Sequence, residues 1–524
     1  MAFSSTVFLS LNYPLPKILS PFSQIYKPRY RPFRIRCSEP ITTSPHMSSP
    51  FDLRSYWTSM ISHIEADLDA AIPIAYPDKI YESMRYSVLA NGAKRASPIM
   101  CIATCELVGG DRSIALPTAS ALEMVHTASL IHDDLPCMDA APLRRGRPSN
   151  HALFGVDLAV LTGDALFPLA FRHVVGHTSP SLVPPQTILR VIGEIARTVG
   201  STGMAAGQMF DLLPAYGGEH EDVMIVLEKK FGEMAECSAV CGGYLGGAGE
   251  EEVEKLRRYG RAVGVLYEVV DDILMEEEKG VGGNGRSGKM RSNASVVRTL
   301  GMERAMEIVE ELSEKAKKEL KGFGDKYGDR VLPLYSFVDY AVERGFTIES
   351  QGKATVAAGD TAPHMAFSAT VFVSPDFPLH KILSPFSQIY KSRHRSFTIR
   401  CSEPIATLPP MSSSFNYSVL SNGAKRAFPI ICITTCKLVG GDRSIALPTT
   451  SALEIVHSAS LIHDDLPCMD ASPLHCSRPS NHALFGVDLI VLARPFSPLH
   501  SVMSSAIPRL PSFHRRRFYA SSER

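Results

Sequence analysis

The chain has 524 residues, of which 45% are hydrophobic, and this is enough for one or more globular cores. Basic and acidic residues are equal in number, 54 each, so no net charge attracts nucleic acid or an anionic membrane. No uninterrupted apolar run reaches the roughly 18 residues that cross a bilayer, and the longest candidate, residues 155–171, contains Asp157 and Asp164. We therefore expect a soluble protein without a membrane span.

The first 50 residues have the composition of an organellar leader. The first 38 contain no acidic residue, and their positive charge lies among serines, prolines and aromatic residues. The basic residues are Lys17, Lys27, Arg29, Arg31, Arg34 and Arg36. This composition favours a plastid (chloroplast) transit peptide within a disordered leader, although a plain disordered terminus can have the same composition.

Residues 51–348 have the pattern of an all-α domain. Apolar residues recur at helical spacing over 120–132, 250–275 and 302–320, and few stretches alternate as strands do. Helix breakers gather at 180–185, 216–219 and 280–288. The pattern predicts a helical bundle around a central cavity.

Three carboxylates, Asp133, Asp134 and Asp139, gather where the helix predicted over 120–132 ends. Pro136 lacks an amide proton and forces a bulge, which can return Asp139 to the side of Asp133. Such a cluster is costly unless a cation neutralises it, and Mg²⁺ with diphosphate oxygens is the natural occupant. The alternative is a solvated acidic turn, which the forked donors of the neighbouring Arg144 and Arg145 make less favourable.

A second acidic pair, Asp271 and Asp272, lies within the helix predicted over 250–275 and would face the first set. Taken alone, such a pair is usually exposed surface. Further polar groups that could contact a diphosphate occur along the chain. They are Lys94, Arg95, Lys230, Lys289 and Gln208, the last with Asp211 three residues on.

Two CxxxC patterns occur in predicted helices, Cys101 with Cys105 and Cys237 with Cys241. On a helix each pattern places two small apolar side chains on one face. Ordinary buried cysteine is the simplest interpretation of this pattern. Zinc is disfavoured because no further ligand at suitable spacing completes either pair, and a disulfide four residues apart on a helix has poor geometry.

The second half of the chain repeats the first. Met365 begins a copy of the leader that starts at Met1, and from Tyr417, which corresponds to Tyr86, the copy continues at an offset of 331. The copy therefore lacks the region around Trp57, and it stops matching near residue 492. We expect a linker with the duplicated leader over 349–414, a truncated copy over 415–492 that cannot bury a complete core, and an unrelated tail over 493–524.

The motifs of residues 51–348 together resemble the plant plastidial trans-isoprenyl diphosphate synthases of the geranylgeranyl diphosphate synthase type. The motifs are Met84 to Leu89 before Lys94–Arg95, the DDxxxxD–LRRG block, Gly163 to Leu166, Gly207–Gln208 with Asp211, and Val270 to Ile273. The resemblance implies an isoprenoid-synthase-type bundle in which Mg²⁺ ions on two Asp-rich motifs hold an allylic diphosphate for attack by isopentenyl diphosphate. It also implies that His126 contacts isopentenyl diphosphate.

Several positions depart from this family pattern. Where the family has an arginine that grips isopentenyl diphosphate the chain has Ser97, and where it has a threonine after the lysine the chain has Phe231. Glu268 replaces a glutamine before the second motif, and Met275 replaces its last aspartate. Losing one buried charged contact costs about 2–4 kcal/mol of transition-state stabilisation, so several losses predict slow turnover.

The two CxxxC pairs and the damaged second motif resemble the small, largely non-catalytic subunits of the family. That resemblance implies that Cys101, Cys105, Cys237 and Cys241 contact a catalytic large subunit. We expect a small-subunit-like protein that modulates such a partner; a Mg²⁺-dependent prenyltransferase active by itself and a non-functional gene product are the alternatives. The truncated copy has His475 and Cys476 in place of Arg144 and Arg145, and no second motif, so we expect no activity from it.

Overall fold

The computed structural model describes residues 51–212, 222–280, 294–344, 417, 427–475 and 478–493. The first copy contains helices that range from short turns to a long helix of 31 residues. They are α1 (Leu53–Ala71), α2 (Asp78–Val88), α3 (Ala96–Leu107), α4 (Arg112–Asp133), α5 (Asn150–Phe154), α6 (Val156–His177), α7 (Pro185–Val199), α8 (Met204–Leu212), α9 (Val223–Leu227), the π-helical turn η2 (Glu228–Gly232), α10 (Glu233–Gly246), α11 (Glu250–Gly280), α12 (Val296–Leu300), α13 (Met302–Glu319), α14 (Phe323–Tyr327), the 3-10 turn η3 (Gly328–Val331) and α15 (Leu332–Glu343).

The first copy is a helical bundle, as the sequence predicted. The helices expected over 120–132, 250–275 and 302–320 lie within α4, α11 and α13, and residues 180–185 form the loop and start of α7. The breakers at 216–219 and most of 280–288 lie outside the described residues. The short strands β1 (Leu143–Arg144) and β2 (Arg147–Pro148) pair antiparallel across a tight turn.

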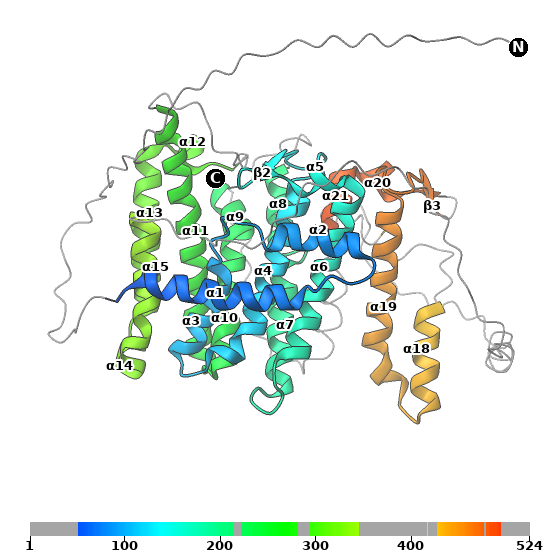
Figure 1. The fold of residues 1–524 in the computed structure, drawn as a ribbon, viewed down its shortest axis with the longest axis horizontal. Helices are drawn as coiled ribbons and strands as arrows, with labels where there is room; N and C mark the ends of the chain where they lie inside the picture. The colour runs from blue at the N-terminus through cyan, green and yellow to red at the C-terminus, as the bar shows by residue number, and fades with distance from the viewer. Residues whose placement is uncertain are drawn as a thin grey trace, which may run out of the picture.

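The core of the bundle forms around α4 and α10. Helix α4 packs against α3 and α6, and α10 packs against α3, α7 and α11 (Figure 1). Helix α4 begins after Asp111, whose carboxylate accepts a hydrogen bond from the Ser113 amide at 2.8 Å and caps the helix. Because neighbours surround it, α4 is apolar on most of its circumference, and Leu122, Met124 and Val125 are fully buried.

Three of the described helices, α4, α6 and the second-copy helix α19, are long and apolar enough to cross a membrane by length and composition alone. In α4, 72% of the most apolar window is buried inside the protein, against 50% in α6 and 33% in α19. The expectation of no membrane span, which rested on uninterrupted apolar runs, is therefore not confirmed and stays a prediction.

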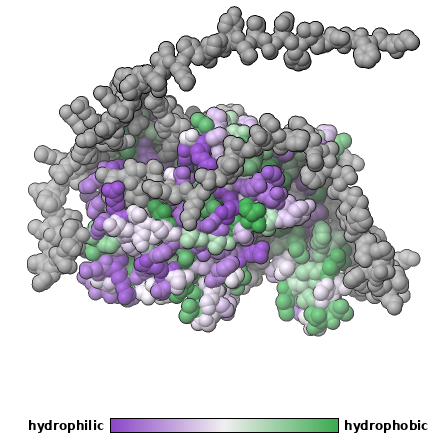
Figure 2. All heavy atoms as spheres, viewed as in Figure 1, coloured by the Kyte–Doolittle hydropathy of each residue, from purple (hydrophilic) through white to green (hydrophobic). Residues whose placement is uncertain are grey.

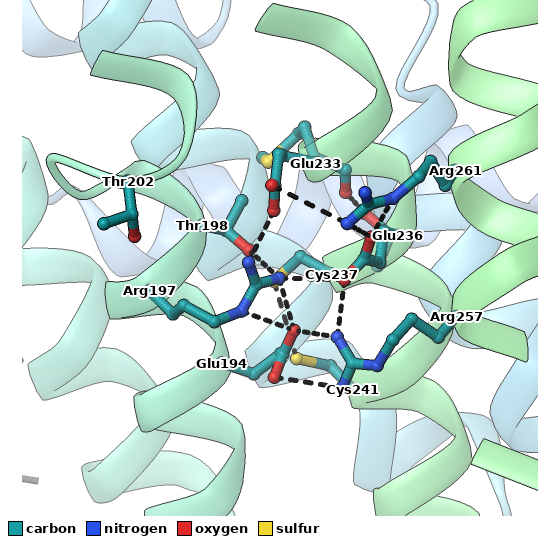
Figure 3. A network of polar contacts seen from close by, with 12 residues as sticks. Glu194, Arg197, Thr198, Thr202, Glu233, Glu236, Cys237, Cys241, Arg257 and Arg261 are labelled. Atoms are coloured by element: carbon teal, nitrogen blue, oxygen red, sulfur yellow. Dashed lines mark hydrogen bonds and ion pairs between the residues drawn. The ribbon is translucent and has the colours of Figure 1, made fainter. Parts of the chain in front are cut away.

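A buried network of charges ties α7, α10 and α11 together (Figure 3). Glu236 is 1% exposed and accepts hydrogen bonds from Arg197 at 3.0 Å, Arg257 at 2.5 Å and Arg261 at 2.6 Å. Glu194 and Glu233 share the same arginines. Each buried carboxylate is therefore neutralised by guanidinium groups from other turns or helices, which fixes how the three helices pack.

The second copy consists of α18 (Ala427–Leu438), α19 (Arg443–Asp464), α20 (Asn481–Phe485) and α21 (Val487–Ala493), with strands β3 (Leu474–His475) and β4 (Arg478–Pro479). The expectation of an incomplete core is confirmed, because α18 has no buried residue. In Figure 2 hydrophobic residues cover the lower right of the molecule, where Figure 1 places α18 and α19. Exposed apolar residues there include Phe428, Ile431 and Val456.

Candidate functional site

The first Asp-rich motif folds back on itself as predicted. Helix α4 ends at Asp133, and Pro136 follows in a turn that cannot continue the helix. The amide of Asp139 donates a hydrogen bond to the carbonyl oxygen of Asp133 at 2.9 Å, which returns Asp139 to the end of the helix. Asp133 and Asp139 are half-buried and Asp134 is buried. The bulge therefore brings separated carboxylates to one place.

Lys230, whose charge acts on Asp133 and Asp139, forms an ion pair with Asp211. Its Nζ lies 2.6 Å from Oδ2 of Asp211, and both side chains are almost fully buried. The lysine belongs to η2, where the wider π-helical turn approaches α8 so closely that a Cβ on Gly207 would lie 2.6 Å from the Lys230 amide nitrogen. Glycine is thus required at position 207 to bring Lys230 and Asp211 together.

We call the end of α4 with Asp133 and Asp139 the first wall of the site, and α11 with Asp271 and Asp272 the second wall. The charges on the first wall favour binding of a cation. Burial raises the pKa of Asp133 to about 7; the charge of Lys230 opposes the shift and the charge of Asp139 adds to it. Burial likewise raises the pKa of Asp139, against the opposing charge of Lys230. One lysine therefore does not fully compensate these carboxylates, and a further cation would stabilise their ionised forms.

Arg144 and Arg145 lie on the β1–β2 turn on the other side of Asp134. The Arg144 Nε donates to the two Asp134 carboxylate oxygens at 3.1 and 3.0 Å, so Asp134 is neutralised within the chain. Arg145 has a left-handed backbone with φ of 53°. These arginines line a pocket with Arg147, Tyr86 and Asn150, where several donors converge.

His126 lies two turns before Asp133 on α4 and is half-buried. Burial lowers its pKa, and the charges of Arg145 and Arg144 lower it further, whereas Glu123 raises it. Its Nδ1 has no hydrogen-bond partner within the described part of the chain. His126 therefore faces the arginine side of the site as a neutral ring.

In the second Asp-rich motif, the carboxylate of Asp271 is already paired with basic side chains of the same chain. Asp271 Oδ1 lies 3.0 Å from the guanidinium of Arg344, and Oδ2 lies 3.9 Å from Lys94. Both cations also lie over the ring of Tyr267, Arg344 at 3.2 Å and Lys94 at 4.7 Å from its centroid. Residue 271 is therefore held in a compact ion pair.

Asp272, the other carboxylate of this motif, supports the start of α12. It accepts a hydrogen bond from the Ser295 hydroxyl at 2.9 Å and another from the Val297 amide at 2.9 Å. Such bonds satisfy amides that have no partner at the beginning of a helix. Its oxygens are thus used for local structure.

Arg95, expected to contact a diphosphate, lies instead inside the bundle. It is 2% exposed, and its guanidinium donates to Glu65 at 2.7 Å, to the Val88 carbonyl at 2.6 Å, and to Glu123. The expectation that Arg95 presents its charge to a ligand does not match this arrangement, because burial beside two glutamates fixes the side chain in the core. Lys94, the residue before it, keeps a 43% exposed side chain.

Two predicted site residues remain. Gln208 on α8 is buried, and neither polar atom of its amide has a hydrogen-bond partner among the described residues. A buried amide without partners is costly, so a ligand or water is needed to satisfy it. Lys289 lies outside the described residues.

These residues meet only part of the requirement for Mg²⁺. Within the described ranges, no three His, Cys, Asp or Glu side chains converge as a metal site. Asp133 and Asp139 have the oxygen donors that Mg²⁺ prefers, and their charge is incompletely compensated within the chain. Asp271 and Asp272 already have cationic or amide partners. The first motif therefore fits Mg²⁺ by its donors, whereas the second does not fit in this arrangement.

The four predicted interface cysteines lie inside the first copy, where α3 crosses α10. Cys101, Cys105, Cys237 and Cys241 are all 0% exposed. The Cys237 and Cys241 sulfur atoms lie 3.8 Å apart, and both residues border the charge network (Figure 3). The sulfur atoms have no exposed surface for direct contact with a partner here, so a role at a subunit interface stays a prediction.

The sequence analysis did not identify the residues that occupy or surround the carboxylates of the second motif. Tyr267, Ser295 and Arg344 contact it, yet none belongs to a recognisable motif. The left-handed Arg344, with φ of 48°, ends α15, and a carboxyl-terminal cap gives no indication of which distant carboxylate it pairs with.

The helical bundle, with its two Asp-rich motifs on α4 and α11, defines the class of protein. The chain belongs to the polyprenyl synthetase family, whose model matches residues 77–316 and, in the second copy, residues 409–503. This confirms the predicted family and the duplication of its amino-terminal part. Members of the family generally use Mg²⁺.

Two curated relatives from Arabidopsis thaliana are informative. The small subunit of a heterodimeric geranylgeranyl pyrophosphate synthase is 59% identical over 319 residues, covering 60% of this chain and 91% of the relative. Large subunit 1 of such a synthase is 42% identical over 304 residues, covering 56% of this chain and 80% of the relative. Both are chloroplastic, which confirms the plastid localisation predicted from the leader.

Among solved structures, an apo FPP/GFPP synthase from Zymomonas mobilis is 29% identical. It aligns with a TM-score of 0.49 and covers 55% of this chain and 99% of its own.

Proposed function

We propose that the first copy acts as a small subunit: it binds a catalytic polyprenyl synthase subunit in plastids, modulates its output, and has little prenyltransferase activity alone. The similarity to a small subunit, 59% identical over 319 residues, supports this assignment. The partner would be a chain of the large-subunit type, to which this chain is itself related at 42% identity.

The observation that carries the proposal is the occupied second motif. Arg344 and Lys94 hold Asp271, while Ser295 and the Val297 amide hold Asp272. A catalytic site that ionises an allylic diphosphate needs metal-bound carboxylates on both walls, since charge develops on the leaving diphosphate. Freeing Asp271 would leave the buried guanidinium of Arg344 without its carboxylate partner, which opposes release of Asp271 toward a metal.

The first wall supports binding without turnover. Asp133 and Asp139 would hold Mg²⁺, and Lys230, Arg144, Arg145 and Gln208 would contact the diphosphate oxygens. The metal, when bound, would neutralise diphosphate charge. The chain's own residues would orient the diphosphate between the end of α4 and the β1–β2 turn, where forked guanidinium donors are available.

The direct test is a prenyltransferase assay of the full chain with isopentenyl and dimethylallyl diphosphates and Mg²⁺, with and without a large-subunit synthase. We expect little product from the chain alone and a changed rate or product length when the synthase is present. Appreciable product at catalytic ratios from the chain alone would overturn the proposal in favour of an independent enzyme.

Binding at the first Asp-rich motif can be tested separately by calorimetry with dimethylallyl diphosphate, an allylic diphosphate, and Mg²⁺. We expect Asp133→Asn to weaken binding, because the first motif loses a metal ligand. Asp464→Asn, the equivalent change in the second copy, is the matched control and should leave binding unchanged. Equal loss in the two variants would contradict the assignment of the ligand to the first copy.

A further inference from the structure

The second copy packs against the first through α19 and α21. Ile462, Leu466 and Ile490 are 3%, 0% and 0% exposed and belong to the same hydrophobic cluster as the core of the first copy. Helix α21 contacts α8, and in Figure 1 it lies beside the α5–α8 side of the bundle. Nδ1 of His463 lies 3.1 Å from the carboxylate of Asp164, and both side chains are buried.

The contacts are reciprocal between equivalent residues. Cys137 corresponds to Cys468 and Asp157 to Asp488, at the offset of 331 that relates the copies. Burial raises the pKa of the Cys137 thiol to about 11 and the charge of Asp488 adds to the shift. Burial also raises the pKa of Cys468, and there the added charge is that of Asp157. Both cysteines pack against the hydrophobic cluster that the two copies share, and the aspartate of the other copy is among the charges that act on each.

Apolar residues at equivalent positions of the two copies also border one hydrophobic cluster. Met138 and its equivalent Met469 both pack against the shared cluster, as do Val156 and its equivalent Val487. Contacts in which residue i meets j and j meets i are the mark of a two-fold, isologous interface. Such an interface is self-complementary, so the same surface of the first copy fits any subunit that carries this sequence pattern.

We infer that the second copy occupies, within one chain, the surface through which the first copy would pair with a homologous subunit, and so competes with that partner. The identity of the partner as a catalytic synthase subunit rests on the proposed function. The claim that the second copy covers this surface does not depend on that function. Because the two copies are covalently linked, the second copy acts at an effective concentration on the order of millimolar.

We expect a complete homologous subunit to displace the second copy from this surface. The second copy docks with only a partial core, since α18 has no buried residue. A separate homologous subunit with a full bundle would present the same docking surface, but its counterpart of α18 would be buried in its own core. Release of the second copy therefore frees a surface of the first copy that is already complementary to such a subunit.

The test uses the full chain with Leu466→Glu and Ile490→Glu combined. Both side chains are 0% exposed, both lie in the second copy, and no residue of the first copy changes. Leu438→Glu, at a residue 83% exposed on α18, is the control. Light scattering after size exclusion gives the oligomeric state, and titration with a large-subunit synthase gives affinity. Hydrogen exchange across α6, α8 and α21 reports whether the second copy has undocked while the first copy stays folded.

We expect wild type and control to be monomers of 57.2 kDa, and the double variant to dimerise or to bind the synthase subunit about a hundredfold more tightly. A double variant that undocks yet dimerises without binding the synthase subunit supports the inference and refutes the proposed function. An undocked variant that stays monomeric and binds the synthase subunit as wild type does overturns the inference and leaves the proposed function standing. A dimeric wild-type chain also overturns it.

Discussion

The two copies form the same local structure but bury it differently. Helices α4 and α19 have equivalent ends, Arg112–Asp133 and Arg443–Asp464, and the tyrosine hydroxyls of Tyr86 and Tyr417 donate to equivalent proline carbonyls at 2.7 and 3.0 Å. Helices α3 and α18 are also equivalent in position, yet α3 is mostly buried and α18 has no buried residue.

The difference comes from a missing neighbour. In the first copy α10 packs so closely on α3 that a Cβ on Gly242 would lie 2.1 Å from the Cys101 carbonyl oxygen. The second copy has no counterpart of α10, because its match to the first ends near residue 492. The same pattern of side chains is therefore a core element in one place and an exposed apolar surface in the other, which shows that packing partners decide burial.

The largest expected effect comes from a substitution in α10, the helix that has no counterpart in the second copy. Glu236→Gln leaves Arg197, Arg257 and Arg261 without their shared carboxylate, so we expect a loss of about 3–5 kcal/mol in unfolding free energy. Urea unfolding of the full chain measures it. Glu254→Gln, whose side chain is 55% exposed, should cost less than about 1 kcal/mol. A loss in Glu236→Gln as small as that in Glu254→Gln would show that the network adds little stability.

A matched pair of substitutions sharpens the comparison directly. Cys101→Leu overfills the contact between α3 and α10 and should cost about 1–3 kcal/mol of unfolding free energy. Cys432→Leu, the equivalent change at a half-buried position of α18, should stay within about 0.5 kcal/mol. Both are measured by the same urea titration. Equal costs would mean that α18 is packed as tightly as α3.

Acid should destabilise the first copy through the same network. Burial acts to raise the pKa of Glu194, but hydrogen bonds from Arg257 and the charge of Arg197 outweigh it and hold the pKa below its ordinary 4.5. Lys229 and Arg197 lower the pKa of Glu233 in the same way. Carboxyls with depressed pKa values stabilise the fold above pH 4.5 and lose that contribution as the pH falls through their folded values.

The measurement for this prediction is the melting temperature between pH 6 and pH 3. We expect it to fall as Glu194 and Glu233 become protonated, with a shallower slope in Glu194→Gln. An unchanged slope in that variant would assign the acid sensitivity to other carboxyls.

The smallest expected effect concerns the exposed face of α18. Ile431 is 49% exposed, so Ile431→Lys should lower binding of an apolar dye while changing unfolding free energy by no more than about 0.5 kcal/mol. Thr435→Lys, on an exposed position of the same helix, is the control and should leave dye binding nearly unchanged. A loss of stability in Ile431→Lys would show that this face is covered in solution.

Much of the fold could be predicted because it depends on near neighbours in the chain. Helical periodicity identified α4, α11 and α13, and Pro136 predicted the turn that returns Asp139 to Asp133. The state of Asp271 could not be predicted, because Arg344 reaches it only after α13 and α15 have packed on α11. The burial of Arg95 could not be predicted for the same reason, since its glutamate partners come from α1 and α4.

The sequence alone determined the family, the two Asp-rich motifs, the duplication and the local form of every matching helix, since these depend on residue type and spacing over a few turns. Only the tertiary structure decided which carboxylates keep oxygens for a ligand, that the four cysteines are buried, and where the second copy docks. Those outcomes depend on which surfaces meet in space, and two copies of one sequence show that identical local structure can have different neighbours.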